Sequence, residues 1–133
     1  MSLVIYTDGA CYGNPGPMGV GVVAYKDDKI VWELSEYIGE GTNNIAEYTA
    51  LIRALEFASS TLEKTIHIRS DSELMVKQLT GKYKVKDIKL KVLYGKAIHL
   101  CGGLQVTFEH IPREKNELAD ELSKKAIEKH LKL

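Results

Sequence analysis

Four acidic side chains stand where strands and helices are expected to begin or end: Asp8, Glu47, Asp71 and Asp120. Each has an ordinary explanation, because Asp8 can accept turn hydrogen bonds and Glu47 or Asp71 can belong to a helix cap. Asp120 can form a solvated ion pair with Lys124, four residues later in the sequence. Glu47, however, falls on the apolar stripe of its helix, where a buried carboxylate needs a cation or hydrogen-bond donors.

Taken together, the four carboxylates favour a metal site. If the first and fourth strands are neighbours, Asp8 and Asp71 lie near the same edge of the sheet, and Glu47 points between them. Several carboxylates in so small a space repel one another and gain raised pKa values unless divalent cations hold them. Because neither cysteine nor histidine joins the group, the donor set favours Mg²⁺ or Mn²⁺ over zinc.

The elements that must position these side chains follow from the apolar pattern. "LVIYTDG" is apolar on both alternating faces, which is typical of a central strand, and two antiparallel strands follow it. The pattern then predicts alternating helices and strands. The expected strands are 3–9, 19–26, 30–39, 65–71 and 104–111, and the expected helices are 44–60, 72–79, 86–100 and 114–131. We therefore predict an α/β fold with a mixed five-stranded sheet, three antiparallel N-terminal strands and flanking helices.

Composition limits the classes of protein that remain. A chain of 133 residues, 44% of them hydrophobic, predicts a single domain over residues 1–133. Its 18 basic and 18 acidic residues give no overall field that would attract nucleic acid or an anionic membrane. Two cysteines are too few for a disulfide framework. No stretch suits a membrane span or a signal peptide, so we expect a cytoplasmic monomer without membrane contact.

Four motifs in this order resemble the type 1 ribonuclease H family over essentially the whole chain: "TDGACYGNPG", "TNNIAEYTAL", "SDSELMVKQL" and "NELADELS". The resemblance implies the RNase H-like fold, and Asp8, Glu47, Asp71 and Asp120 match the family's four metal-binding acids. It further implies an endonuclease that cuts the RNA strand of RNA/DNA hybrids with two Mg²⁺ ions, or Mn²⁺, leaving 5′-phosphate and 3′-hydroxyl ends. In that mechanism one metal activates the attacking water and the other stabilises the leaving oxygen.

The same resemblance implies contacts with the substrate. Positions that contact the hybrid are matched by Cys11, Asn14, Asn43 and Asn44, and a position near a DNA-strand phosphate is matched by Thr42. The glycines at positions 9, 13, 16 and 19 would let backbone amides approach the minor groove, where RNA displays its 2′-hydroxyls. These residues also suit ordinary structure, because asparagines cap helices and glycines beside prolines form turns.

Two regions depart from the commonest form of the family. Only one helix fits between "SELMVKQL" and the last strand, so the separate basic protrusion of some members is absent. The lysine-rich segment 82–96 either replaces it as a phosphate-binding face or forms an ordinary solvated surface. The candidate contacts there are Lys82, Lys84, Lys86 and Lys89. Where many members carry a histidine before the last acid, we favour Arg113 over Glu114, because "VTFEHI" places His110 within a strand.

Three other interpretations stay open. A catalytically silent hybrid-binding module would be expected to lack one of the four acids, and none is lacking. A DNA junction resolvase or transposase generally needs extra elements, for which 133 residues leave little room. A fragment of a reverse transcriptase polyprotein is the third, although Met1 directly precedes the first strand, which favours a free-standing enzyme.

Overall fold

The computed structural model describes residues 2–132, which form a five-stranded sheet and four α-helices. The strands are β1 (Ser2–Cys11), β2 (Gly16–Lys26), β3 (Lys29–Gly41), β4 (Thr65–Ser70) and β5 (Gln105–His110). The helices are α1 (Asn43–Ser59), α2 (Glu73–Leu79), α3 (Ile88–Leu100) and α4 (Glu117–Leu131), with a 3₁₀ turn, η1 (Arg113–Lys115), before α4. Within residues 2–132, no helix is both long and apolar enough to cross a membrane.

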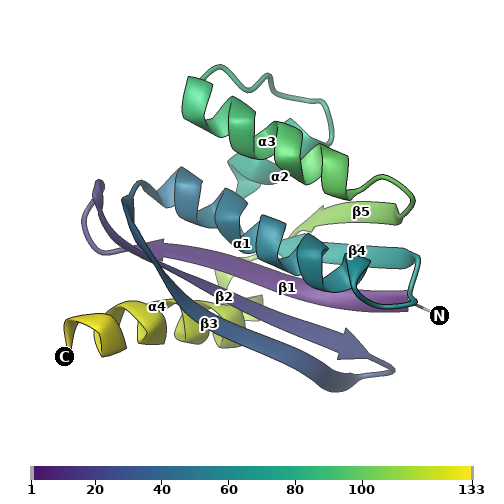
Figure 1. Ribbon diagram of the computed structural model, residues 1–133, viewed down its shortest axis with the longest axis horizontal. Helices are drawn as coiled ribbons and strands as arrows, with labels where there is room; N and C mark the ends of the chain where they lie inside the picture. Colours follow the sequence, from purple (N-terminus) through teal and green to yellow (C-terminus); the bar gives the residue numbers. More distant parts are fainter. Residues whose placement is uncertain (1, 133) are drawn as a thin grey trace.

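The sheet has the strand order β3-β2-β1-β4-β5, so β1 lies at its centre (Figure 1). β1, β2 and β3 pair antiparallel, whereas β1, β4 and β5 run parallel. The predicted fold class, a mixed sheet with three antiparallel N-terminal strands, is therefore confirmed. The expected neighbours β1 and β4 are also confirmed, and their pairing ends where Thr7 lies opposite Ser70.

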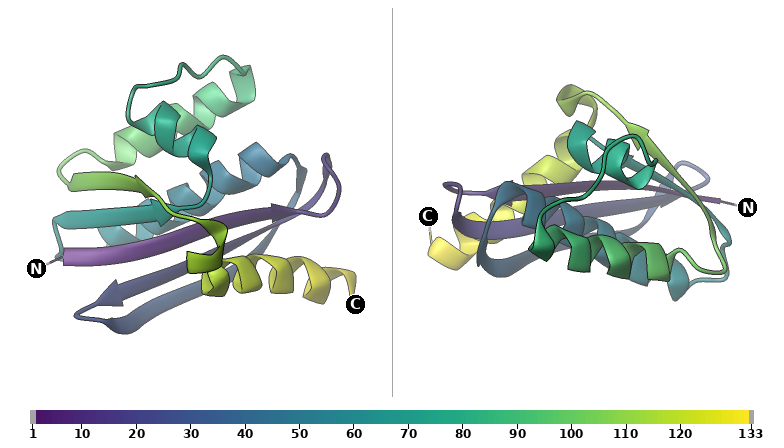
Figure 2. Two further views of the ribbon diagram at one scale, coloured as in Figure 1. Left: turned by 180° about the vertical axis from the view of Figure 1, so that it is seen from behind. Right: turned by 90° about the horizontal axis from the view of Figure 1, so that it is seen from above.

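Helices cover both faces of the sheet. α1 packs across one face with α3 beside it, and α4 lies on the opposite face (Figures 1 and 2). α1 lies close to the sheet because a row of alanines faces inward at every fourth position, all of them fully buried: Ala46, Ala50, Ala54 and Ala58. The core between α1 and the sheet includes Leu3, Ile5 and Leu55. This packing places the first turns of α1 beside β1.

The beginnings of two helices differ from the capping boxes considered for the sequence. At α1, the side chain of Thr42 accepts a hydrogen bond from the amide of Ile45 at 3.3 Å, and Glu47 takes no part. At α2, Ser72 accepts the corresponding bond from Met75, so the proposed cap around Asp71 is wrong. Both carboxylates are therefore available for other partners.

Strand β1 runs past Asp8 to Cys11, two residues beyond the predicted end, and β2 begins earlier than predicted. Three of the glycines expected to admit nucleic acid, Gly9, Gly16 and Gly19, lie within these strands and pack against the protein itself. A Cβ atom on Gly9 would lie 2.3 Å from the carbonyl carbon of Ala46, and one on Gly19 would lie 2.2 Å from the carbonyl oxygen of Ser123. Gly9 and Gly19 let α1 and α4 approach the sheet, and their approach to nucleic acid stays a prediction.

Candidate active site

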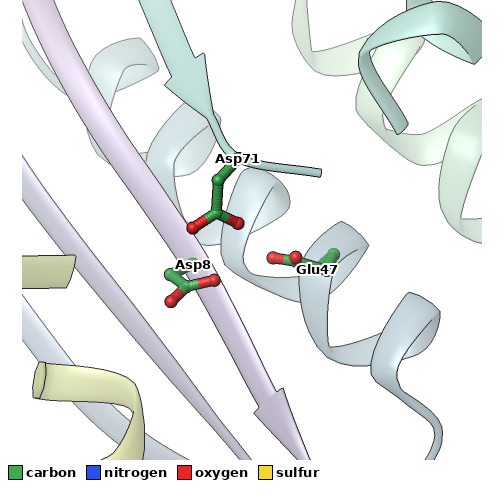
Figure 3. Close-up of side chains that lie close together, drawn as sticks. All are labelled: Asp8, Glu47 and Asp71. Atoms are coloured by element: carbon green, nitrogen blue, oxygen red, sulfur yellow. The ribbon is translucent and has the colours of Figure 1, made fainter. Parts of the chain in front are cut away.

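Three of the four acids predicted from the sequence converge at one end of β1. Asp8 lies on β1, Glu47 lies on α1, and Asp71 directly follows β4, and their carboxylates point toward a common space (Figure 3). One oxygen of each lies within 4.8 Å of the other two. The convergence follows from the topology, because β1 and β4 are parallel neighbours and α1 packs against β1.

Asp120, the fourth predicted acid, stands beside this group. Its carboxylate belongs to α4, helps to raise the pKa of Asp8, and forms an ion pair with Lys124, whose Nζ lies 3.1 Å from Oδ2. All four acids line one open cavity of about 340 Å³. The remaining lining residues are Gly9, Ala10, Cys11, Tyr12, Asn43, Arg113 and Lys124.

The carboxylates hold their protons unusually strongly. Burial raises the pKa of Asp8 to about 10, and the charges of Glu47 and Asp71 add to the effect. Burial and the charge of Asp71 raise the pKa of Glu47 to about 8, against the opposing effects of the Gly9 amide and Arg113. Burial also raises the pKa of Asp71. At neutral pH the group therefore carries protons or binds a cation in their place.

The donor atoms fit a hard divalent cation. Every candidate ligand in the three-residue group is a carboxylate oxygen, the donor that Mg²⁺, Mn²⁺ and Ca²⁺ prefer. Cys11 lines the cavity, but its thiol donates a hydrogen bond to the carbonyl of Gly13 at 2.6 Å. The amide of Gly9 donates to Oε1 of Glu47 at 2.7 Å and holds that side chain against β1.

Arg113 and His110 both lower the pKa of Asp71, but only Arg113 lines the cavity. Arg113 lies in η1 and lines the cavity, where its charge lowers the pKa of both Glu47 and Asp71. His110 is the last residue of β5, as expected, and neither it nor Glu114 is among the cavity-lining residues. Arg113 is thus placed to act on this site, and its role stays a prediction.

The predicted substrate-contact residues gather around the beginning of α1. Cys11 and Asn43 line the cavity, and the side-chain oxygen of Asn14 accepts a hydrogen bond from the amide of Asn43 at 3.1 Å. Thr42 caps the helix, and Asn44 is exposed on its first turn outside the cavity lining. The structure therefore brings the turn after β1 and the beginning of α1 together.

The predicted phosphate-binding lysines lie elsewhere. Lys82, Lys84 and Lys86 are exposed in the loop between α2 and α3, and Lys89 is exposed on the first turn of α3. None of these four side chains lines the carboxylate cavity. Any contact they make with a substrate is therefore at a distance from the acids.

Sequence reasoning missed two residues near the acids. Tyr12 lines the cavity, and its hydroxyl donates a hydrogen bond to Glu128 of α4, which raises the pKa of the tyrosine to about 12. Asn116 is buried beside Asp71, to which its side-chain amide donates at 3.5 Å. Its place inside the "NELADELS" motif was the available signal, since the motif already contained Asp120.

Comparison with known proteins places this fold and site in one class. The reverse transcriptase-like domain family matches residues 6–126. Ribonuclease HI of Halobacterium salinarum is 44% identical over 125 residues, which are 92% of this chain and 63% of that protein. Ribonuclease H of Trichodesmium erythraeum is 34% identical over 143 residues, with 96% of this chain and 89% of that protein covered.

A solved structure agrees with these matches. The crystal structure of LC11-RNase H1 in complex with an RNA/DNA hybrid superimposes with a TM-score of 0.91 at 48% identity, covering 97% of this chain and 99% of that one. The chain belongs to the type 1 ribonuclease H family, as its motifs predicted. It spans 63% of the Halobacterium relative and 36% of a bifunctional mycobacterial relative.

Proposed function

We propose that this protein is an endonuclease that hydrolyses the RNA strand of RNA/DNA hybrids and leaves 5′-phosphate and 3′-hydroxyl ends. The observation that carries the proposal is the convergence of Asp8, Glu47 and Asp71 within 4.8 Å in an open cavity that Asp120 also lines. The presence of a hybrid in the structure of LC11-RNase H1 supports the choice of substrate.

The four acids would hold two Mg²⁺ ions, or Mn²⁺ in their place. When bound, two such cations activate the attacking water and stabilise the oxygen that leaves phosphorus. Asp8, one of the proposed ligands, is only 4% exposed. The Gly9 amide orients Glu47 toward Asp8, and Asp120, which is paired with Lys124, would supply the fourth carboxylate.

Arg113 supplies the positive charge nearest to the reacting phosphate in this proposal. Its guanidinium lines the cavity on the side of Glu47 and Asp71, whose pKa values it lowers. A planar guanidinium matches the geometry of phosphate oxygens. Its interaction with these oxygens strengthens as negative charge develops on them. Arg113 therefore assists the step without serving as a ligand.

The beginning of α1 recognises the duplex. The residues that would contact the hybrid are Cys11, Asn14, Asn43 and Asn44. Thr42 would lie near a phosphate of the DNA strand. The turn after β1 and the start of α1 are held together by the bond between Asn14 and Asn43. The positive end of the helix dipole there favours a phosphate. Recognition of 2′-hydroxyls limits cleavage to the RNA strand. The monomeric state and the cytoplasmic location stay predictions.

The substitution Asp71→Asn tests the proposal, because it removes the charge of a proposed ligand and keeps the shape of the side chain. We expect cleavage of the hybrid in Mg²⁺ to fall about a thousandfold, because a lost ligand charge weakens metal catalysis. At about 1.4 kcal/mol for each tenfold loss in rate, this corresponds to about 4 kcal/mol. Hybrid affinity in Ca²⁺, measured by fluorescence anisotropy, should change by less than about threefold.

The matched control is Asp28→Asn, at an exposed position in the turn between β2 and β3. It removes the same charge far from the cavity and should keep wild-type turnover. Nearly normal turnover of the Asp71 variant would remove this residue from the proposed site.

A further inference from the structure

Asn116 is a buried amide that joins three parts of the site. It is 2% exposed, and it directly precedes α4. Its Nδ2 donates to the backbone carbonyl of Thr7 at 2.9 Å and approaches Oδ2 of Asp71 at 3.5 Å. One side chain therefore touches the strand that carries Asp8 and the carboxylate of Asp71.

The side chain of Asn116 makes these contacts just beyond the last paired residues of β1 and β4. Strand pairing no longer fixes the distance between Asp8 and Asp71 there. The register of β1 and β4 ends with the pair Thr7 and Ser70, and β4 itself ends at Ser70. Asp71 follows this last residue, so no further strand pairing fixes its distance from β1. The amide of Asn116 bridges the two at that point.

The backbone of Asn116 connects the same point to α4 and to η1. Its carbonyl accepts a hydrogen bond from the amide of Asp120 at 3.0 Å, and its own amide donates to the carbonyl of Arg113 at 2.9 Å. The residue therefore lies between the turn that carries Arg113 and the helix that carries Asp120. A shift of Asn116 would move both of these side chains relative to Asp71.

The side chain does not do what asparagine usually does at this position. An asparagine before a helix commonly caps it, yet Asn116 makes no side-chain cap bond to α4. Its Oδ1 is buried without a hydrogen-bond partner among the described residues, which costs free energy. Both features oppose stability, so the direction of the amide toward Thr7 and Asp71 calls for another explanation.

We propose that Asn116 is a positioning residue that orients the carboxylate of Asp71 and sets its spacing from Asp8 and Asp120, so that these acids bind divalent cations together. This inference rests on the metal-dependent function proposed above. Residues that orient metal ligands through hydrogen bonds typically contribute 10- to 100-fold to metal affinity or activity. Asn116 itself is too deeply buried to contact the substrate.

Two substitutions test the proposal. Asn116→Ala removes the amide, and Asn116→Leu removes the donor while it keeps a side chain of similar size. The matched control is Gln78→Ala, which removes another buried amide, hydrogen-bonded to Tyr48 at 2.6 Å away from the acids. Each variant is compared with the wild type by thermal unfolding in EDTA, by Mn²⁺ titration in a calorimeter without substrate, and by cleavage kinetics.

We expect both Asn116 variants to bind Mn²⁺ about 10- to 100-fold more weakly, with a lower kcat and a KM for the hybrid within about twofold of wild type. Higher Mn²⁺ concentration should restore part of the lost cleavage. Gln78→Ala should lose thermal stability and keep wild-type Mn²⁺ affinity.

Three results would contradict these expectations in distinguishable ways. Mn²⁺ affinity within about twofold of wild type in the Asn116 variants, with a lowered melting temperature, would make the residue structural only and overturn the inference. Failure of both variants to fold would overturn it too, because Asn116 would then serve folding. Absence of Mn²⁺ binding by the wild type would instead refute the proposed metal site, and the inference with it.

Discussion

The acids of the site differ in the hydrogen bonds and ion pairs that they form with the rest of the chain. Glu47 accepts a hydrogen bond from the Gly9 amide, and Asp120 has an ion pair with Lys124. Asp8, like Glu47 and Asp71, forms no ion pair with a lysine or arginine among the described residues. Its raised pKa follows first from its burial and then from the charges of Glu47 and Asp71. A bound cation would supply the positive charge that no lysine or arginine side chain provides here.

Arg113 leads to a prediction about pH. Its charge lowers the pKa of Glu47 and of Asp71, so its removal lets both pKa values rise. In the variant Arg113→Gln, the acidic limb of the profile of kcat against pH should move to higher pH, because the carboxylates lose their protons later. At neutral pH, kcat should fall about 10- to 100-fold.

The neighbouring substitution Lys115→Gln is the control, since it removes a positive charge from the same turn outside the cavity lining. It should leave the profile in place. A profile of Arg113→Gln that coincides with that of the wild type would show that this residue does not act on the acids.

Single residues also show where sequence reasoning succeeds. The adjacency of Asp8 and Asp71 was predictable, because a strand that is apolar on both faces belongs in the middle of a sheet. The packing of Gly19 against Ser123 was not, because it depends on how α4 docks onto β2. The hydrogen bond from Asn116 to Thr7 was not either, since it joins residues 109 positions apart.

Among the elements, α1 has the largest influence on the site. It carries Glu47, and its first turn joins the predicted substrate contacts to the cavity. The pattern of apolar residues predicted this helix within one residue at each end, because its stripe is long and regular. The end of β1 was less predictable, since its last residues pair with a glycine-rich part of β2 that looks like a turn.

The lysine-rich segment between α2 and α3 is expected to bind phosphate groups of the substrate in part. Replacing Lys82, Lys84, Lys86 and Lys89 by glutamine should flatten the slope of log affinity against log salt by about one to two units. Partial engagement is expected because three of these lysines lie in the loop and Lys89 lies on α3, so one duplex does not reach them all. Affinity for a hybrid in Ca²⁺, measured at several salt concentrations, gives the slope.

Cleavage at low salt should be nearly preserved in this variant, because the cavity is untouched. The control replaces Lys29 and Lys64, which are exposed at the opposite end of the sheet from the acids. If the slope of the four-lysine variant equals that of the wild type, the segment is a solvated surface.

For the molecule as a whole, the buried acids predict how stability depends on pH without metal. The folded protein keeps protons on Glu47 up to about pH 8 and on Asp8 up to about pH 10, whereas unfolded carboxyls lose them near pH 4. Their contribution to stability is thus fully present below about pH 4 and is lost progressively as the pH rises from there to the raised values. In EDTA, the melting temperature should fall between about pH 5 and pH 8.

Saturating Mg²⁺ should reduce this fall, because it binds the ionised form of the acids in the folded state alone. The variant Glu47→Gln, which has no proton to lose at this position, should show a shallower decline in EDTA than the wild type. A melting temperature that rises over this range, or an unchanged slope in the variant, would refute the assignment of raised pKa values to these groups.

The central claim is that this protein cuts RNA paired with DNA, and one cleavage assay tests it most directly. RNA/DNA, RNA/RNA, DNA/DNA and single-stranded RNA, each labelled at one end of one strand, are incubated with the protein in Mg²⁺ and resolved on a denaturing gel. We expect efficient internal cleavage of the RNA strand of the hybrid, with an intact DNA strand, because the contacts that discriminate require 2′-hydroxyls. Equal cleavage of the DNA duplex, or binding of the hybrid without cleavage, would contradict the account.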